Sequence, residues 1–106
     1  MSSDFIIVLV AVGQAEEAQL IARTLVDESL AACVGMIPQN AVYRWEGETV
    51  EEKEFLLLIK THQTQFSALR KRVLELHSYE VPEIISLAIQ EGHKTYLEWI
   101  ATNVKQ

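Results

Sequence analysis

The stretch that decides the fold reads LELHSYEVPEII and runs from Leu74 to Ile85. Apolar residues at helical spacing lead into it from Phe66, and the apolar run that starts at Ile84 is typical of a buried strand. Pro82 ends the helix before it and favours an extended backbone at Val81. The stretch also gathers an imidazole, a phenol and several carboxylates, and binding residues collect on loops that a rigid scaffold holds. We therefore expect a helix-to-strand corner that carries a binding site.

Four segments are rich in β-branched and apolar residues, which is typical of strands. The predicted strands are Phe5–Val12, Cys33–Trp45, Val50–Thr61 and Ile84–Ile89. A turn at Glu46-Gly47-Glu48 joins the second and third strands into a long hairpin. Pro38 interrupts the second strand, and proline inside a strand points to a sheet edge or a bulge.

Three further segments carry apolar residues on one helical stripe. The first runs from about Ala15 to Leu30, and the second follows a cap at Thr64. The third is a short C-terminal helix lined by Tyr96, Leu97, Ile100 and Val104. The order is βαββαβ plus a helix, which predicts an α+β, ferredoxin-like sandwich with an additional C-terminal helix. Residues 1–106 are expected to form a single domain.

Composition narrows the function classes. Nine Lys and Arg face fifteen Asp and Glu, so the net charge is −6, which disfavours binding to phosphate backbones. The one cysteine, Cys33, excludes an internal disulfide and suits a reducing compartment. The apolar run Phe5–Val12 has no positive charge before it and is too short to span a bilayer. We expect a cytoplasmic protein that binds neither nucleic acid nor membrane.

The predicted sheet has more apolar surface than two helices on one face can cover. The third strand is apolar at consecutive positions from Phe55 to Ile59, so both of its faces need burial. The long hairpin also creates an exposed edge, which is prone to association. A homo-oligomer that covers the open sheet face and the edges would satisfy both requirements.

The polar residues leave several interpretations open. His77 lies at the end of the second helix, where it either caps exposed carbonyls or binds a metal ion or ligand. The acidic residues from Glu46 to Glu54 are either a solvated turn or a weak attractor of hard cations. Lys60 is either a rim residue or the anion-binding group of a pocket. Cys33 is expected to be a buried, inert thiol.

Few sequence features favour catalysis. The chain contains no glycine-rich phosphate loop, no GxSxG sequence and no HExxH pair. An enzyme that uses His77 as a general base is the weakest of the alternatives considered. We therefore expect a protein that is not an enzyme.

Five short segments together resemble the CutA divalent-cation-tolerance family over nearly the whole chain. In order, these are Ala31–Val34, Tyr43–Gly47, Leu58–Thr61, His77–Ile84 and Tyr96–Ile100. The resemblance implies a ferredoxin-like fold in a compact homotrimer, with an architecture like that of the PII signalling proteins. It also implies binding of copper or another divalent cation, and a role in the response to metal ions.

The family pattern transfers unevenly to this chain. Members proposed to bind copper have a cysteine near the end of the first strand and two adjacent histidines at the corner. Those positions are Val10, Leu76 and His77 here, so His77 is the one predicted metal ligand, and Ser78 replaces the usual proline. Four residues do match the family, and the resemblance places them in a ligand-binding cleft between subunits: Trp45, Lys60, Tyr79 and Glu83.

The sequence thus predicts a divalent-cation tolerance protein that binds copper, another divalent ion or a small ligand at clefts of a trimer. Copper binding is expected to be weak, because one imidazole is a poor copper site, and no organic cofactor is expected. The alternative is a PII-like trimeric signalling module that binds a small anion and a protein partner. Lys60 with Tyr79 would favour the anion, and His77 with Glu83 would favour the metal.

Overall fold

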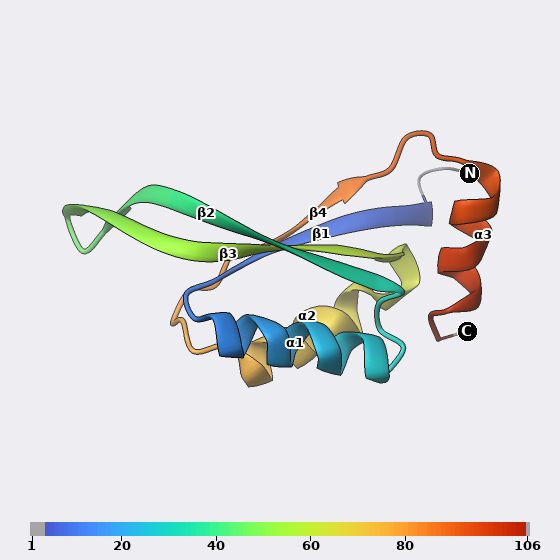
Figure 1. The fold of residues 1–106 in the computed structure, drawn as a ribbon, viewed down its shortest axis with the longest axis horizontal. Helices are drawn as coiled ribbons and strands as arrows, with labels where there is room; N and C mark the ends of the chain where they lie inside the picture. The colour runs from blue at the N-terminus through green and yellow to red at the C-terminus, as the bar shows by residue number, and fades with distance from the viewer. Residues whose placement is uncertain (1–3, 106) are drawn as a thin grey trace.

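The computed structural model describes residues 4–105, and within them the predicted order of elements is confirmed (Figure 1). The strands are β1 (Phe5–Val12), β2 (Cys33–Trp45), β3 (Glu48–His62) and β4 (Ile84–Ala88). The helices are α1 (Ala15–Asp27), the short 3₁₀ turn η2 (Gln63–Gln65), α2 (Phe66–Leu76) and α3 (Lys94–Thr102). No helix in this part of the chain is long and apolar enough to cross a membrane.

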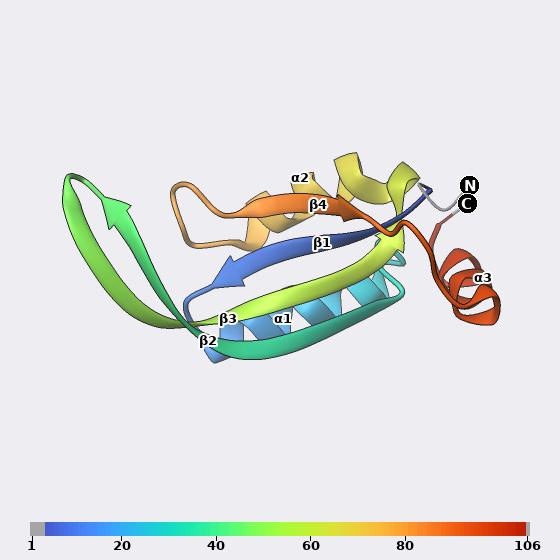
Figure 2. The same ribbon diagram turned by 90° about the horizontal axis from the view of Figure 1, so that it is seen from above.

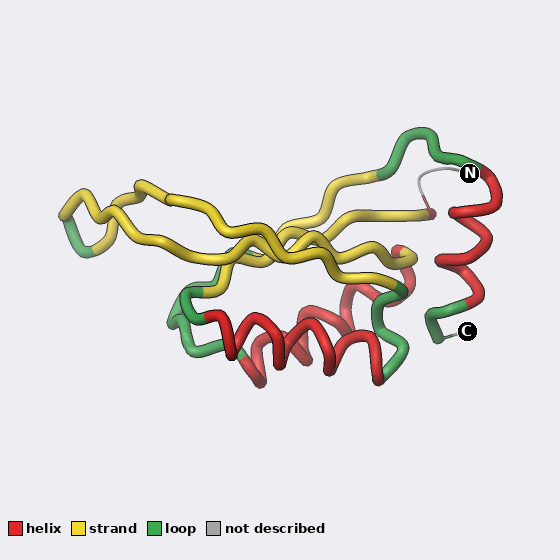
Figure 3. Tube along the Cα trace, viewed as in Figure 1, coloured by secondary structure: helices red, strands yellow, loops and turns green. Residues whose placement is uncertain are grey.

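The four strands form one antiparallel sheet in the order β2-β3-β1-β4 (Figure 2), and Figure 3 shows them in yellow. β1 and β3 pair along the full length of β1, from Phe5 opposite His62 to Val12 opposite Phe55. The β2–β3 hairpin continues beyond that pairing, so its tip extends past the rest of the sheet (Figure 1). Pro38 lies in β2 at the sheet edge, as predicted, where its missing N–H removes no hydrogen bond from a central ladder.

Helices α1 and α2 cover one face of the sheet, and α3 lies at the end opposite the hairpin tip (Figures 1 and 2). The core lies between this sheet face and the two helices. Strand residues of alternating position, Val8, Val10, Leu57 and Ile59, meet helix residues Ile21, Leu25, Leu69 and Val73, and all eight are fully buried.

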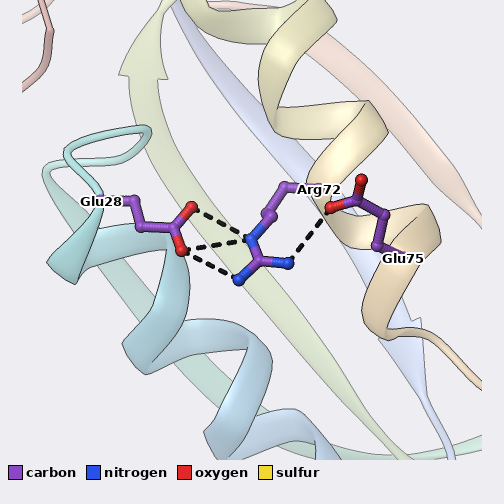
Figure 4. Close-up of polar contacts among 3 residues, drawn as sticks. All are labelled: Glu28, Arg72 and Glu75. Atoms are coloured by element: carbon purple, nitrogen blue, oxygen red, sulfur yellow. Dashed lines mark hydrogen bonds and ion pairs between the residues drawn. The ribbon is translucent and has the colours of Figure 1, made fainter.

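Arg72 on α2 ties the two helices together (Figure 4). Its guanidinium donates from Nε and Nη2 to the carboxylate of Glu28, which follows α1, with a closest distance of 2.9 Å. It also donates from Nη1 to Glu75 at 3.1 Å. These side chains are partly exposed, so the ion pairs contribute modestly to stability and mainly fix how α1 and α2 lie together.

Within residues 4–105, no helix lies over the opposite face of the sheet (Figure 1). Strand pairing places Ile37, Ile85 and Leu87 on this open face, and each is about half exposed. Lys60 shares the face, because it alternates with the core residues Leu57 and Ile59 along β3. An apolar sheet face left in water favours association.

Three local predictions need correction. α1 ends at Asp27 rather than Leu30, because Ser29 adopts a left-handed backbone with φ of 60° that ends the helix. Thr64 does not cap α2: it lies inside η2, where its N–H bonds to the imidazole of His62. The hairpin turn is shorter than predicted, with Glu46 and Gly47 both at positive φ, which suits a two-residue turn.

We predict that Leu57→Ala lowers the free energy of unfolding by about 2–5 kcal/mol, because it opens a cavity between the sheet and both helices. Leu20→Ala on the exposed side of α1 is the matched control, since Leu20 is 52% exposed. Urea denaturation followed by circular dichroism measures both. Equal losses in the two variants would contradict this location of the core.

Candidate functional site

A groove of about 830 Å³ runs between the β2–β3 hairpin and the loop that joins α2 to β4. Three aromatic side chains line it, namely Tyr43, Trp45 and Tyr79. Four glutamates line it too, namely Glu52, Glu54, Glu80 and Glu83. In the described part of the chain Arg44 is the one basic residue in its wall. We call this feature the acidic groove.

Glu54 is the most buried acid of the acidic groove, with 6% of its surface exposed. Its Oε1 accepts from the amide of Gln39 at 3.0 Å, because the two residues are opposite each other on β3 and β2. Its Oε2 accepts from the hydroxyl of Tyr79 at 3.2 Å. Among residues 4–105 no lysine or arginine pairs with this carboxylate. A buried acid is therefore held by neutral donors alone, which leaves its charge uncompensated.

The environment of the groove disfavours charge on the carboxyl group of Glu83 and on the phenols of Tyr43 and Tyr79. Burial, and then the charge of Glu54, raise the pKa of Glu83. Tyr43 hydrogen-bonds to Glu52, and this bond is the main reason that its pKa rises to about 12. Burial, and then Glu54, raise the pKa of Tyr79 further. Both phenols therefore stay protonated and act as donors toward the carboxylates.

His77 holds the loop that carries Tyr79. Its Nε2 lies 2.7 Å from the carbonyl oxygen of Ala11 on β1, and its Nδ1 accepts the backbone N–H of Tyr79 at 3.0 Å. This pattern requires the tautomer with the proton on Nε2. Glu17 on α1 adds a second tie, because its carboxylate accepts from both the N–H and the hydroxyl of Ser78. The corner is thus fixed to β1 and α1.

Gly13 makes room for the phenol of Tyr79. A Cβ at this position would lie 2.7 Å from the Tyr79 hydroxyl oxygen and 3.3 Å from two ring carbons. A real side chain there would have to displace the ring. The glycine after β1 therefore allows Tyr79 to lie where it reaches Glu54.

The predicted site residues fall into two groups. Trp45, Tyr79 and Glu83 line the acidic groove, although their role in ligand binding stays a prediction. Lys60 does not line it: it lies six positions after Glu54 on β3, about 20 Å along the strand. A single chain thus brings three of the four predicted residues together, and Lys60 lies apart from them.

The family model for the CutA1 divalent ion tolerance protein matches residues 6–103. The chain belongs to the CutA1 family. It is 49% identical over 98 residues to the divalent-cation tolerance protein CutA of Thermus thermophilus, which is 92% of this chain and 95% of that protein. A solved structure of the divalent cation tolerance protein from the same organism has a TM-score of 0.92 at 47% identity, covering 95% of this chain and 99% of the other.

The CutA homolog of Xenopus laevis is also similar, at 47% identity over 87 residues. That match covers 81% of this chain but 58% of the homolog, so this chain spans less than two thirds of the longer relative.

The metal chemistry suggested by the CutA1 resemblance meets an obstacle in this chain. Within residues 4–105, no three histidine, cysteine or acidic side chains lie close enough to hold a metal ion. His77 has a fully buried side chain, and both its ring nitrogens already take part in hydrogen bonds. A metal ion at His77 would have to displace one of these bonds. The donor set therefore does not fit a preformed copper centre, and the metal role of His77 stays a prediction.

Sequence reasoning missed the most buried acid of the groove. It grouped Glu54 with the exposed glutamates of the hairpin, but the α2–β4 loop folds over this one. Gln39 and Gly13 were missed as well. The spacing of Gln39 and Glu54 about the hairpin turn is a signal that could have paired them, because cross-strand partners lie at equal distances from the turn.

We predict that Gly13→Ala displaces the Tyr79 ring and breaks its hydrogen bond to Glu54. The clash should destabilise the fold by about 1–3 kcal/mol, as overpacking does. In the double variant Gly13→Ala, Tyr79→Ala the clash is absent, so the added cost of the alanine at position 13 should fall sharply. Thermal unfolding of the four proteins in this cycle measures the coupling, and additive effects would contradict the contact.

Proposed function

We propose that this protein acts in divalent-cation tolerance as a homotrimer that binds cations in its acidic grooves. The carboxylate of Glu54, buried in the groove without a cationic partner, carries the proposal. A positive ligand would compensate this charge and the neighbouring charge of Glu83. No redox or covalent chemistry is needed for this role, so we propose that the protein is not an enzyme.

The raised pKa of Glu83 supports the cation rather than the anion. Its carboxylate is partly desolvated and repelled by Glu54, so a bound cation relieves a repulsion that is present in the free protein. An anion would add to that repulsion. No contact in the described part of the chain favours the PII-like alternative, because Lys60 lies outside the groove.

Copper is proposed as a weak ligand only. Val10 is buried in the core and Leu76 packs against it, and neither side chain has a lone pair to donate. The groove offers carboxylate oxygens, which suit hard ions, whereas copper favours imidazole and sulfur. Divalent ions are therefore expected to bind the groove with low selectivity.

Assembly completes the proposed cleft. The open face carries half-exposed Ile37, Ile85 and Leu87, together with Lys60. Packing such faces around a threefold axis would bury the apolar residues. It would also bring the groove of one subunit beside a neighbouring subunit. We propose that the ligand-binding cleft lies between subunits for this reason.

We predict that Mg²⁺, Mn²⁺ and Cu²⁺ bind weakly, and that Glu83→Gln weakens all three by several-fold. Binding should fall as the pH is lowered through the raised pKa of Glu83, since the protonated acid no longer attracts a cation. Calorimetry in a non-chelating buffer measures this, with Glu98→Gln on α3 as the charge-matched control. Tight copper binding that is lost in His77→Ala but kept in Glu83→Gln would place the metal at His77 instead.

We predict a trimer at micromolar concentration, measured by analytical ultracentrifugation. Leu87→Glu should dissociate it, because a charge on the open face opposes burial. Leu20→Glu on α1 is a matched control, since both leucines are 52% exposed in the single chain. A wild-type monomer, or equal dissociation in both variants, would rule out assembly through the open face.

A further inference from the structure

We infer that α3 and the residues after it form a strap that opens and recloses as one unit against the end of the sheet, with the buried amide of Gln65 as its latch. The moving segment is residues 94–105, which we call the C-terminal strap. It lies at the end of the molecule opposite the hairpin tip (Figure 1). The inference does not rest on the proposed function.

The C-terminal strap packs against the sheet through an apolar cluster of its own. Ile100 and Val104 are buried there with Ala32, which lies just before β2. Phe5 and Leu97 pack on this cluster while partly exposed. The main core, between the sheet and helices α1 and α2, is a separate and larger cluster. Because segments with few buried apolar contacts open at the lowest free energy, the strap should open well before the domain unfolds.

α3 is too short to persist once it leaves the sheet. It spans nine residues, from Lys94 to Thr102, and isolated helices shorter than about 12–15 residues are marginal in water. In the described part of the chain, the side chain of His93 at the N-cap position makes no capping bond. Undocking and melting of the helix are therefore one event, which makes the strap a cooperative unit.

A buried amide fastens the end of the strap. Gln65 in η2 is 7% exposed, and its Nε2 donates to the carbonyl oxygen of Lys105 at 2.8 Å. The N–H of Lys105 donates in turn to the carbonyl oxygen of Ser29 at 2.9 Å. Both backbone groups of Lys105 are thus held, one from the turn before α2 and one from the turn after α1.

Opening of the strap removes the acceptor that Gln65 uses. A buried amide that loses its partner is costly to the protein until water replaces that partner, so the amide favours the closed strap. Gln63 lies in the same 3₁₀ turn but is exposed. It therefore offers a matched control of the same residue type in the same turn.

Hydrogen exchange of the wild-type protein, followed by mass spectrometry at several low urea concentrations, tests the inference. We expect the amides of the strap to exchange together, with protection at least tenfold lower than in β1 and β3. Their exchange should depend less on urea, because opening of the strap exposes little surface.

Gln65→Met keeps the length of the side chain and removes its donor, so exchange in the strap should become about tenfold faster. The tip of the β2–β3 hairpin should exchange as in wild type, because its openings leave the strap closed. Gln63→Met should change neither segment.

Three results would overturn the inference. Exchange of the strap with the same protection and urea dependence as β1 and β3 would show that it opens only when the domain unfolds. Widely different rates along the strap would show that α3 frays instead of opening as a unit. Equal effects of Gln65→Met and Gln63→Met would show that the buried amide is not the latch. The first two results come from the wild-type protein alone, so they decide even if Gln65→Met does not fold.

Discussion

The acidic groove depends on one imidazole. His77 joins the end of β1 to the loop after α2, through the carbonyl of Ala11 and the N–H of Tyr79. Because both bonds are made by one buried, rigid ring, the loop has little freedom to move away from the sheet. Tyr79 then lies over Gly13 and reaches Glu54 on a different strand. Without His77 the loop would not hold Tyr79 over the carboxylate of Glu54, which is the buried acid of the hairpin.

The order of strands and helices could be predicted because the residue patterns that specify each element are local in the sequence. Runs of β-branched and apolar residues predicted the strands, helical spacing of apolar residues predicted α1 and α2, and Pro82 indicated that α2 must end before it. The errors occur where a backbone angle or a long-range contact, rather than the residue type, determines where a helix begins or ends. Ser29 ends α1 with a left-handed backbone that its residue type does not announce. Thr64 is a good capping residue by type, yet His62 takes that role for the preceding turn.

The groove was less predictable, since its residues meet only after folding. Trp45, Tyr79 and Glu83 were selected through a family resemblance, and they do share one groove. Their neighbour Glu54 looked like an ordinary surface acid, because burial by a loop distant in sequence leaves no local pattern. For His77, the sequence could not distinguish a free imidazole from one with both nitrogens engaged. That distinction depends on where the Ala11 carbonyl points.

Glu83 in the groove also makes the stability of the fold depend on pH. A carboxyl group whose pKa is raised by folding binds its proton more tightly in the folded state, so its protonated form favours folding. For Glu83 that benefit is complete at acidic pH and is lost as the pH rises through the raised pKa. Above that raised pKa the ionised carboxylate of Glu83 therefore opposes folding. A ligand that brings a positive charge removes this cost only in the folded protein, and so stabilises the fold as it binds.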